Sequence, residues 1–408
     1  MVGAGGVGSS GGGVLSEAGR ELLSRLAGED VGPERALALS ESLRAEYPAD
    51  LVAAALTQQA LRTAARAKFS QADQMLFTRA GLEQASSELT ARHAAARFAG
   101  SAVIADLCCG IGGNLIALAA APAADNRTVI GVDLDLTSLE FARHNVAVSV
   151  PGARAAFVLA DVTRLPLDGV DAVFTDPARR DDRRRMRAGQ SQPPLDWCLR
   201  LAGTVPRVGI KAAPGLPREL VPAGWEAEFV AVGRDLKEAL LWSPALASGA
   251  ATRATVLPAG DTLAGPAAGG TTTPDQVPLA PPGAYLLDPN PAVTRAGLVT
   301  SLARATGTWQ IDPMIAFLSA DEPVRTPFAR TLRVLESAPW HEKRFARRLR
   351  ELGIGAADIR RRGLAGDVVQ IHRRLGLRGP GSATIVLTRV ADRPWGLICA
   401  PPDPDPDP

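Results

Sequence analysis

The pattern of apolar and polar positions divides the chain into a helical first part, an alternating middle part and a mixed last part. Over 14–99, leucine and alanine recur at helical spacing, which predicts amphipathic helices. Over 100–258, short apolar runs such as 103–105, 128–132 and 170–174 alternate with helical stretches. Such runs are typical of parallel strands that are buried on both faces. The alternation therefore predicts an α/β region built on a doubly wound sheet.

A glycine-rich turn follows the first of these strands. Asp106 ends the apolar run, Gly110 and Gly112 lie in the turn, and Asn114 opens a helical pattern. Glycine lets a ligand approach the backbone closely and adopts a positive φ without strain. The start of the helix adds free N–H groups beside such a ligand. A dinucleotide-binding fold uses a similar turn, so the glycines alone leave the cofactor open.

Acidic residues also stand at or beside the ends of the next strands. They are Asp133, Asp161 and Asp176. In an open α/β sheet, the carboxyl ends of the strands line the ligand crevice, and a carboxylate at the position of Asp133 can bind both ribose hydroxyls of a nucleoside. The spacing therefore predicts a nucleoside-containing cofactor at this edge of the sheet.

Taken together, these motifs resemble the class I S-adenosylmethionine-dependent methyltransferases over 78–258. Stretches 106–116 and 129–135 are similar to the RNA-modifying branch that includes trimethylguanosine synthases. The resemblance implies a Rossmann-like sheet and S-adenosyl-L-methionine as the cofactor. It implies that Asp133 takes the ribose and Asp161 the adenine amine. For the methionine end, it implies the first turn, namely Asp106, Cys108, Gly110, Gly112 and Asn114.

The segment before the first strand often folds over the cofactor in this family. By the resemblance, candidates for the pocket wall are Thr78, Arg79, Glu83 and Gln84. The alternative is an ordinary loop with a helix-capping residue. A basic helix face lies nearby and is either solvated or a contact surface for phosphates. It consists of Arg62, Arg66, Lys68 and Arg79.

The stretch after the fourth strand carries the candidate chemistry. Amino-directed methyltransferases have Asp or Asn, two prolines and an aromatic residue there, whereas this chain has Asp176 and Pro177, then Ala178 and Arg179. By the resemblance, Asp176 accepts a hydrogen bond from the target amine, Pro177 holds the turn and Arg179 grips phosphate. RNA uracil carbon-5 methyltransferases have Asp-Pro-Pro-Arg and need a later nucleophilic cysteine. Cys198 lies in a helical context, so we discount it for that role.

Two further patterns complete the middle part. Six arginines crowd into 179–187, and we favour contact with substrate phosphates over a solvated loop for them. Residues 207–212 predict a fifth strand that has Lys211 at its end. Stretches 225–234 and 253–257 predict a closing antiparallel hairpin. Between them, Asp235 and Glu238 stand either in a turn or near the site.

The last part predicts a smaller α+β domain. Stretches 351–363 and 383–389 resemble the THUMP-like domain found behind some bacterial methyltransferases, and THUMP domains bind RNA in tRNA modification enzymes. A basic surface is expected from Arg344, Arg347, Arg348, Arg350, Arg360, Arg361, Arg362, Arg373 and Arg374, unless they pair with nearby acids. The predicted divisions are a disordered 1–13, a helical domain 14–99, a methyltransferase domain 100–258, a linker 259–282, a THUMP-like domain 283–400 and a disordered tail 401–408.

Composition bears on the ligands, the metal content and the location of the protein. The net charge of the 408 residues is only +2, so overall charge does not indicate nucleic acid, and aromatic residues at 4% disfavour extensive base stacking. The four cysteines form no CxxC pair, so we expect neither zinc nor a disulfide framework. No signal peptide or membrane span is visible, which favours a soluble cytoplasmic protein. The pattern does not assign an oligomeric state.

The sequence thus predicts a methyltransferase that modifies a base in a structured RNA, tRNA or rRNA. Two alternatives stay open. One is a methyltransferase that acts on a small molecule or protein, and the other is a non-catalytic RNA-binding protein that keeps the fold.

Overall fold

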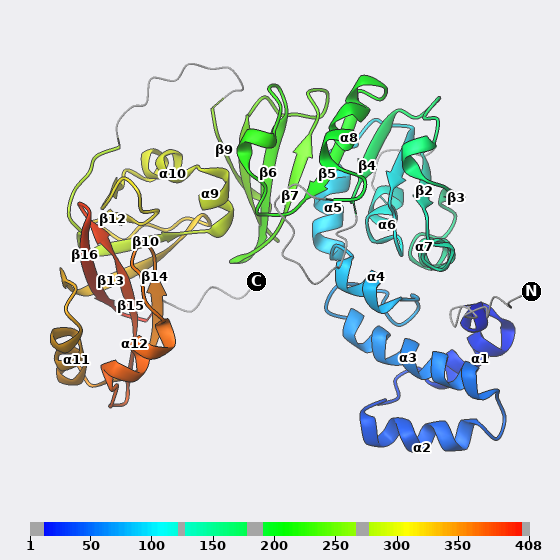
Figure 1. Ribbon diagram of the computed structural model, residues 1–408, viewed down its shortest axis with the longest axis horizontal. Coiled ribbons are helices and arrows are strands. Elements are labelled where there is room, and N and C mark those ends of the chain that lie inside the picture. The colour runs from blue at the N-terminus through cyan, green and yellow to red at the C-terminus, as the bar shows by residue number, and fades with distance from the viewer. Residues whose placement is uncertain (1–11, 121–126, 178–190, 267–276, 402–408) are drawn as a thin grey trace, which may run out of the picture. The chain divides into compact units, whose positions relative to one another are not determined.

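The computed structural model describes residues 12–120, 127–177, 191–266 and 277–401. The chain forms two compact units (Figure 1). One runs to Ala213 and includes Leu240–Ala247, and the other consists of Pro214–Ala239 and the chain from Ser248 onward. Most of the predicted disordered ends and all of 179–187 lie outside the described residues. The domain boundaries drawn from the sequence therefore remain predictions.

Helices form the first part of unit 1, as the leucine spacing predicts. They are α1 (Glu17–Arg25), α2 (Pro33–Leu43), α3 (Ala49–Ala65), α4 (Arg79–Gln84) and α5 (Glu88–Ala96), after a short 3-10 turn at Gly12–Leu15. Their apolar core includes Leu22, Val52 and Phe77, and it also takes in Ile111 of the glycine turn and Phe141. The N-terminal helices and the glycine turn therefore share one core.

In the sheet of unit 1, the first five strands pair in parallel. Its strands run in the order β3-β2-β1-β4-β5, and each described pair of neighbours is parallel. The strands are β1 (Val103–Leu107), β2 (Thr128–Asp133), β3 (Arg154–Leu159), β4 (Ala172–Thr175) and β5 (Arg207–Ala212). The connecting helices are α6 (Gly113–Ala120), α7 (Leu136–Ser149) and α8 (Leu195–Arg200). The strand order reverses between β1 and β4, which is where ligands bind in open α/β sheets.

The first strands of unit 2 correct one prediction. β6 (Glu226–Val232) and β8 (Thr252–Leu257) pair in parallel, so the antiparallel hairpin predicted for 225–234 and 253–257 is wrong. The reason is that the intervening residues form a strand of their own, β7 (Asp235–Trp242), so the chain reverses twice between β6 and β8. β9 (Asp261–Ala264) pairs antiparallel with β8 and lies inside the predicted linker.

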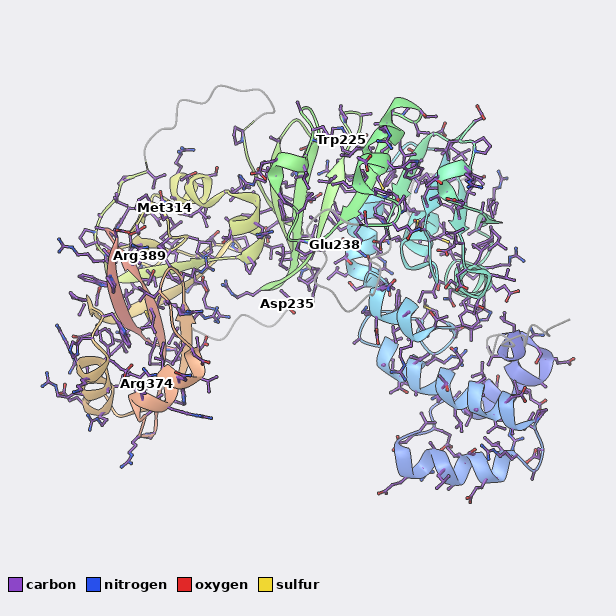
Figure 2. All side chains as sticks on the ribbon, in the orientation of Figure 1. Trp225, Asp235, Glu238, Met314, Arg374 and Arg389 are labelled. Atoms are coloured by element: carbon purple, nitrogen blue, oxygen red, sulfur yellow. The ribbon has the colours of Figure 1, made fainter. Side chains whose placement is uncertain are left out.

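Asp235 and Glu238 therefore stand on a strand and not in a turn. Figure 2 labels both side chains on β7. Glu238 is buried, whereas Asp235 is exposed and pairs with Lys237 at 3.1 Å between Nζ and Oδ2. We assign neither residue to the active site.

The rest of unit 2 is an α+β domain around a seven-stranded sheet, ordered β11-β12-β10-β13-β16-β15-β14. Its strands are β10 (Tyr285–Pro289), β11 (Trp309–Gln310), β12 (Leu318–Ala320), β13 (Ala329–Pro339), β14 (Ile354–Arg361), β15 (Gly381–Val390) and β16 (Arg393–Cys399). Its helices are α9 (Pro291–Ala296), α10 (Val299–Thr306), α11 (Glu342–Glu351) and α12 (Val368–Leu375). Figure 1 shows α11 beside α12, and both helices contribute to a core with the last strands. Of the described helices, none has both the length and the apolar character needed to cross a membrane.

Candidate active site

The glycine turn is fastened onto the second strand of the sheet. The N–H groups of Cys108 and Cys109 both donate to the carbonyl oxygen of Val132, at 2.9 and 3.0 Å. Gly110 and Gly112 have φ of 52° and 89°, a region that favours glycine. Cys108 shares this region with a φ of 66°, which is uncommon for a residue with a side chain. The turn is therefore a constrained structure that brings backbone groups close to the end of β1.

Asp133 belongs to the same structure. Its Oδ2 accepts a hydrogen bond of 2.8 Å from the N–H of Gly110, and its Oδ1 accepts one of 2.9 Å from Asp135. An ionised carboxylate has about four acceptor positions, so Asp133 keeps capacity for a ligand. Asp135 caps α7 by accepting a hydrogen bond from the N–H of Ser138.

Exposed apolar side chains surround Asp133. Leu134 and Leu136 are 65% and 52% exposed, and Leu159, which is in register with Asp133 on the neighbouring strand, is 53% exposed. Large apolar side chains with this exposure form a surface on which the face of a flat aromatic ring can pack.

Asp106 is buried without a hydrogen-bond donor. The residue is 1% exposed, and neither carboxylate oxygen has a partner among the described residues. Burial raises the pKa of Asp106 well above its ordinary value, and the charges of Asp176 and Asp133 raise it further, while Lys211 opposes them. A buried acceptor without a donor is costly unless a ligand supplies one.

Lys211 links two elements at the reversal point of the sheet. Its Nζ lies 2.6 Å from Asp176 Oδ2 and donates to Ser86 Oγ at 2.9 Å. Lys211 comes from β5, Asp176 follows β4, and Ser86 precedes α5. Asp106 therefore lies within electrostatic reach of the carboxylates of Asp133 and Asp176 and of the ammonium group that pairs with Asp176. Such a site suits a ligand that carries positive charge.

Of the predicted catalytic stretch, the structure describes Asp176 and Pro177 but not Arg179. Pro177 is buried directly after Asp176. Arg179 lies outside the described residues. Cys198 is buried, and burial raises the pKa of its thiol to about 12, which does not favour a nucleophilic thiolate.

Thr78 and Asp161 each have a local structural role. Thr78 caps α4 by accepting a 2.9 Å hydrogen bond from Gly81 N–H, which fits the alternative of a capping residue. Asp161 Oδ1 accepts from the Thr163 hydroxyl and N–H at 2.7 and 2.9 Å. These hydrogen bonds lower the pKa of Asp161. It stays ionised and acceptor-only beside the end of β3.

The basic helix face before the sheet is largely used inside the protein. Lys68 Nζ donates to the carbonyl oxygens of Leu82, Glu83 and Ala85, at 2.7, 3.1 and 3.0 Å, and so satisfies the C-terminal end of α4. Arg62 is buried, and its Nε donates to Met75 O at 2.9 Å.

Arg66 pairs with Asp73 at 2.9 Å, whereas Arg79 is exposed. Arg62 and Lys68 are thus committed to backbone carbonyl groups and Arg66 to an acid, so these contacts give no support to a phosphate surface on this face.

Sequence reasoning missed Asn145 of α7. This residue is fully buried, its Oδ1 accepts from Leu76 N–H at 2.7 Å, and its Nδ2 donates to Leu76 O and Ile111 O, each at 2.9 Å. It thus ties the segment before α4 to the glycine turn. The available signal is an amide residue between the apolar Ala142 and Val146 of an otherwise buried helix face. The adjacent His144 contacts Gln74 O at 2.9 Å, which is a structural role.

These observations define the class of the protein. A parallel sheet with a glycine turn, strand-end acids and a reversal of strand order at the site is an α/β enzyme fold for a nucleoside-containing cofactor. Residues 104–186 match a family model described as a methyltransferase domain, and 329–401 match one described as THUMP domain-like. Residues 13–65 match a domain of unknown function.

An uncharacterized S-adenosylmethionine-dependent methyltransferase of Mycobacterium tuberculosis, strain CDC 1551, is 39% identical over 323 residues, which cover 78% of this chain and 85% of that protein. Its counterpart in strain H37Rv matches to the same extent. The chain belongs to the S-adenosylmethionine-dependent methyltransferases, and S-adenosyl-L-methionine is its cofactor. This confirms the family, the enzyme class and the cofactor predicted from the sequence.

The fold has a counterpart among solved structures. A crystal structure from Porphyromonas gingivalis W83, described as a candidate methyltransferase, superposes with a TM-score of 0.74 at 20% identity. The match covers 90% of this chain and 98% of that one, so the fold extends over both units. The predicted fold class, a methyltransferase sheet with a THUMP-like α+β domain, is confirmed. Among the described residues, no cluster of His, Cys, Asp and Glu is arranged to hold a metal ion.

Proposed function

We propose that the protein transfers the methyl group of S-adenosyl-L-methionine to a base of a structured RNA, tRNA or rRNA. The observation that carries the proposal is the Asp176–Lys211 ion pair, which stands at the reversal point of the sheet beside the buried Asp106. It supplies an acceptor of fixed orientation next to the cofactor site.

The residues present fit the cofactor. Its sulfonium and ammonium groups are positively charged, and Asp106 offers two buried oxygens that lack donors. In our proposal, Asp133 takes the ribose, Asp161 the adenine amine, and the exposed leucines beside Asp133 cover the face of the adenine. The methionine end is held by the turn, namely Asp106, Cys108, Gly110, Gly112 and Asn114, and Thr78 contributes to the wall.

The bound cofactor supplies a methyl group that is already activated, so the protein contributes mainly positioning. Asp176 accepts a hydrogen bond from the target amine and orients its lone pair. Lys211 holds the Asp176 carboxylate in that orientation, and the buried Pro177 stiffens the turn. Arg179 grips a substrate phosphate. An orientation fixed before the substrate binds costs no reorganisation during the reaction.

The THUMP-like match over 329–401 supports RNA as the substrate class. Four free cysteines and a substrate of this kind fit a cytoplasmic location, which is part of the proposal. A small molecule or protein substrate is the competing assignment.

The test is a comparison of methylated nucleosides. Total tRNA and rRNA from a deletion strain are digested and analysed by mass spectrometry, and the strain is complemented with the wild type or with Asp176→Ala. We expect one methylated nucleoside to be missing, the wild type to restore it and D176A to leave it missing. An unchanged nucleoside inventory, together with a methylated metabolite or protein that disappears, would favour the competing assignment.

A further inference from the structure

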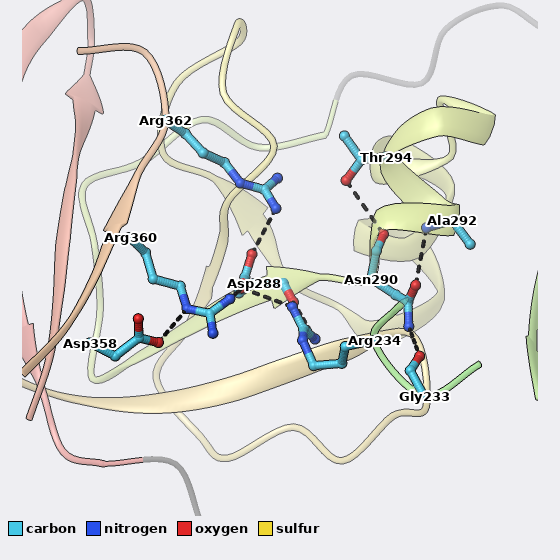
Figure 3. Close-up of polar contacts among 9 residues, drawn as sticks. All are labelled: Gly233, Arg234, Asp288, Asn290, Ala292, Thr294, Asp358, Arg360 and Arg362. Carbon is cyan, nitrogen blue, oxygen red and sulfur yellow. Dashed lines mark hydrogen bonds and ion pairs between the residues drawn. The ribbon is translucent and has the colours of Figure 1, made fainter. Parts of the chain in front are cut away.

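One buried carboxylate in unit 2 is shared by three arginines. Asp288 of β10 has a side chain that is 1% exposed. Its Oδ2 lies 2.8 Å from Arg234 Nη2 and 3.1 Å from Arg360 Nη1, and its Oδ1 lies 2.9 Å from Arg362 Nη2. Figure 3 shows the three guanidinium groups converging on this carboxylate from the β6–β7 connection and from the end of β14.

The positive charge in this group exceeds the negative charge. Burial lowers the pKa of Arg234. The carboxylate of Asp288 raises this pKa, whereas the positive charges of Arg330, Arg360 and Arg362 lower it further. Asp358 supplies the second acid, because its Oδ2 pairs with Arg360 Nε at 2.9 Å. Four guanidinium groups thus face two carboxylates, so two positive charges are in excess.

Arginines of α11 pair with glutamates. Arg344 and Arg348 pair with Glu336, and Arg347 and Arg348 pair with Glu351. These arginines of α11 therefore agree with the alternative prediction for this domain, in which the basic residues pair with nearby acids.

Donors remain available in the arginine group. Each guanidinium group has five N–H donors. The four arginines together therefore have more donors than the two carboxylates can accept. The Nε of Arg330 is buried and has no partner among the described residues. A hollow of about 250 Å³ opens at the group, lined by Asp288, Asp358, Ile359, Arg360, Arg361 and Arg362.

We propose that Arg360, Arg361 and Arg362, which line this hollow, bind a phosphate group there, and that Arg234 and Arg330 add to the positive charge around Asp288. Guanidinium groups bind phosphate oxygens bidentately, and a dianion or diester supplies the charge that Asp288 alone does not. The identity of the phosphate rests on the proposed function, under which it is a phosphodiester of the RNA substrate. Asp288 holds the guanidinium groups in place before the phosphate arrives.

The first experiment needs no RNA. Thermal unfolding of the full chain is followed with and without inorganic tripolyphosphate, for the wild type, for Arg360→Gln with Arg362→Gln, and for the control Arg344→Gln with Arg347→Gln. We expect tripolyphosphate to raise the Tm of the wild type and the control by about 2–4 °C. The R360Q/R362Q variant should lose most of that shift.

Two results would overturn the proposal. One is an equal shift in all three proteins, and the other is no shift in the wild type. If R360Q/R362Q does not fold, the single variant R360Q takes its place, because it keeps Arg362, whose guanidinium group lies over the ring of Phe317.

The second experiment identifies the phosphate. Binding of unfractionated tRNA is titrated at two salt concentrations with the same proteins. R360Q/R362Q should weaken binding roughly tenfold and flatten the slope of log K against log salt by about 0.7 for one single-stranded phosphate. Tripolyphosphate binding without any effect on tRNA would retain the anion site and reject the RNA diester. Failure of the nucleoside test with a retained tripolyphosphate shift would reject the proposed function alone.

Discussion

Lys211 Nζ lies 2.6 Å from Asp176 Oδ2, and the two side chains are only 16% and 27% exposed. The ammonium group also donates to Ser86 Oγ, so it is fixed from two sides. The carboxylate that we assign to the target amine is thus oriented by the protein and not by solvent.

Lys211→Gln should lower the rate constant of methyl transfer with little change in cofactor affinity. The variant removes the charge that holds Asp176, and the loss of one preorganised charged group costs roughly 10²-fold in rate. Single-turnover methylation of the RNA that the nucleoside comparison identifies gives the rate constant of methyl transfer, and calorimetry gives the affinity for S-adenosyl-L-methionine.

The control for this prediction is Lys237→Gln. Lys237 also pairs with an aspartate, Asp235, but both side chains are exposed, at 46% and 82%. An exposed pair contributes about 0–1 kcal/mol, so K237Q should keep the wild-type rate. Equal rates for K211Q and the wild type would contradict the positioning role.

Asp106→Asn should stabilise the cofactor-free protein at neutral pH. The folded-state pKa of Asp106 is raised above its ordinary value of 3.8, first by burial. As the pH rises above that value, the unfolded chain loses a proton that the folded protein retains, so stability falls with rising pH. Asn removes this dependence.

The measurement compares Tm values of the wild type and D106N at pH 5 and pH 8 without cofactor. The gain in D106N should be larger at pH 8, whereas affinity for S-adenosyl-L-methionine should drop roughly tenfold with the loss of a charged acceptor. A variant that is less stable at both pH values and binds cofactor normally would reject Asp106 as a ligand residue.

Asp133→Ala should weaken cofactor binding by roughly ten- to a hundredfold, because a hydrogen bond to a charged group contributes about 1.5–3 kcal/mol. The variant also removes the acceptor of Gly110 N–H and so loosens the turn. Calorimetry measures the affinity. Asp135→Ser, which keeps a capping group for α7, should bind within about twofold of the wild type. Unchanged affinity in D133A would remove Asp133 from the site.

Lys68→Met should lower the free energy of unfolding by about 2 kcal/mol, since it leaves three carbonyl groups of the α4 end without their charged donor. Urea denaturation measures the change. Arg79→Ala, at an exposed position of the same segment, should change stability by less than about 0.5 kcal/mol. Equal effects of the two substitutions would show that Lys68 does not hold α4.

The sheet of unit 1 could be predicted because its information is local. The first four strands are short apolar runs with an acid at or beside their ends, and Asp106, Asp133 and Asp176 mark three of those ends directly. The helix after the turn starts at Gly113, one residue before Asn114, which had been expected to open it. What the pattern could not give is the pairing of β6 with β8, because the charged start of β7 resembles a turn.

The sequence also could not predict which groups the charged side chains contact. Arg62 and Lys68 look like a solvated face, yet both reach backbone carbonyl groups that only the fold brings near. Asp288 stands in an apolar strand far in sequence from Arg234 and Arg362, so its shared role appears only once the fold brings these side chains together. The arginines at 179–187 remain a prediction.

The amide of Asn145 has a thermodynamic consequence. Because one side chain holds both Leu76 and Ile111, opening of the N-terminal helices breaks contacts of the cofactor turn as well. By linkage, a ligand that tightens the turn must slow amide hydrogen exchange at Leu76. The local opening of the N-terminal helices thus reports cofactor occupancy, since it is coupled through Asn145 and the shared core to the glycine turn.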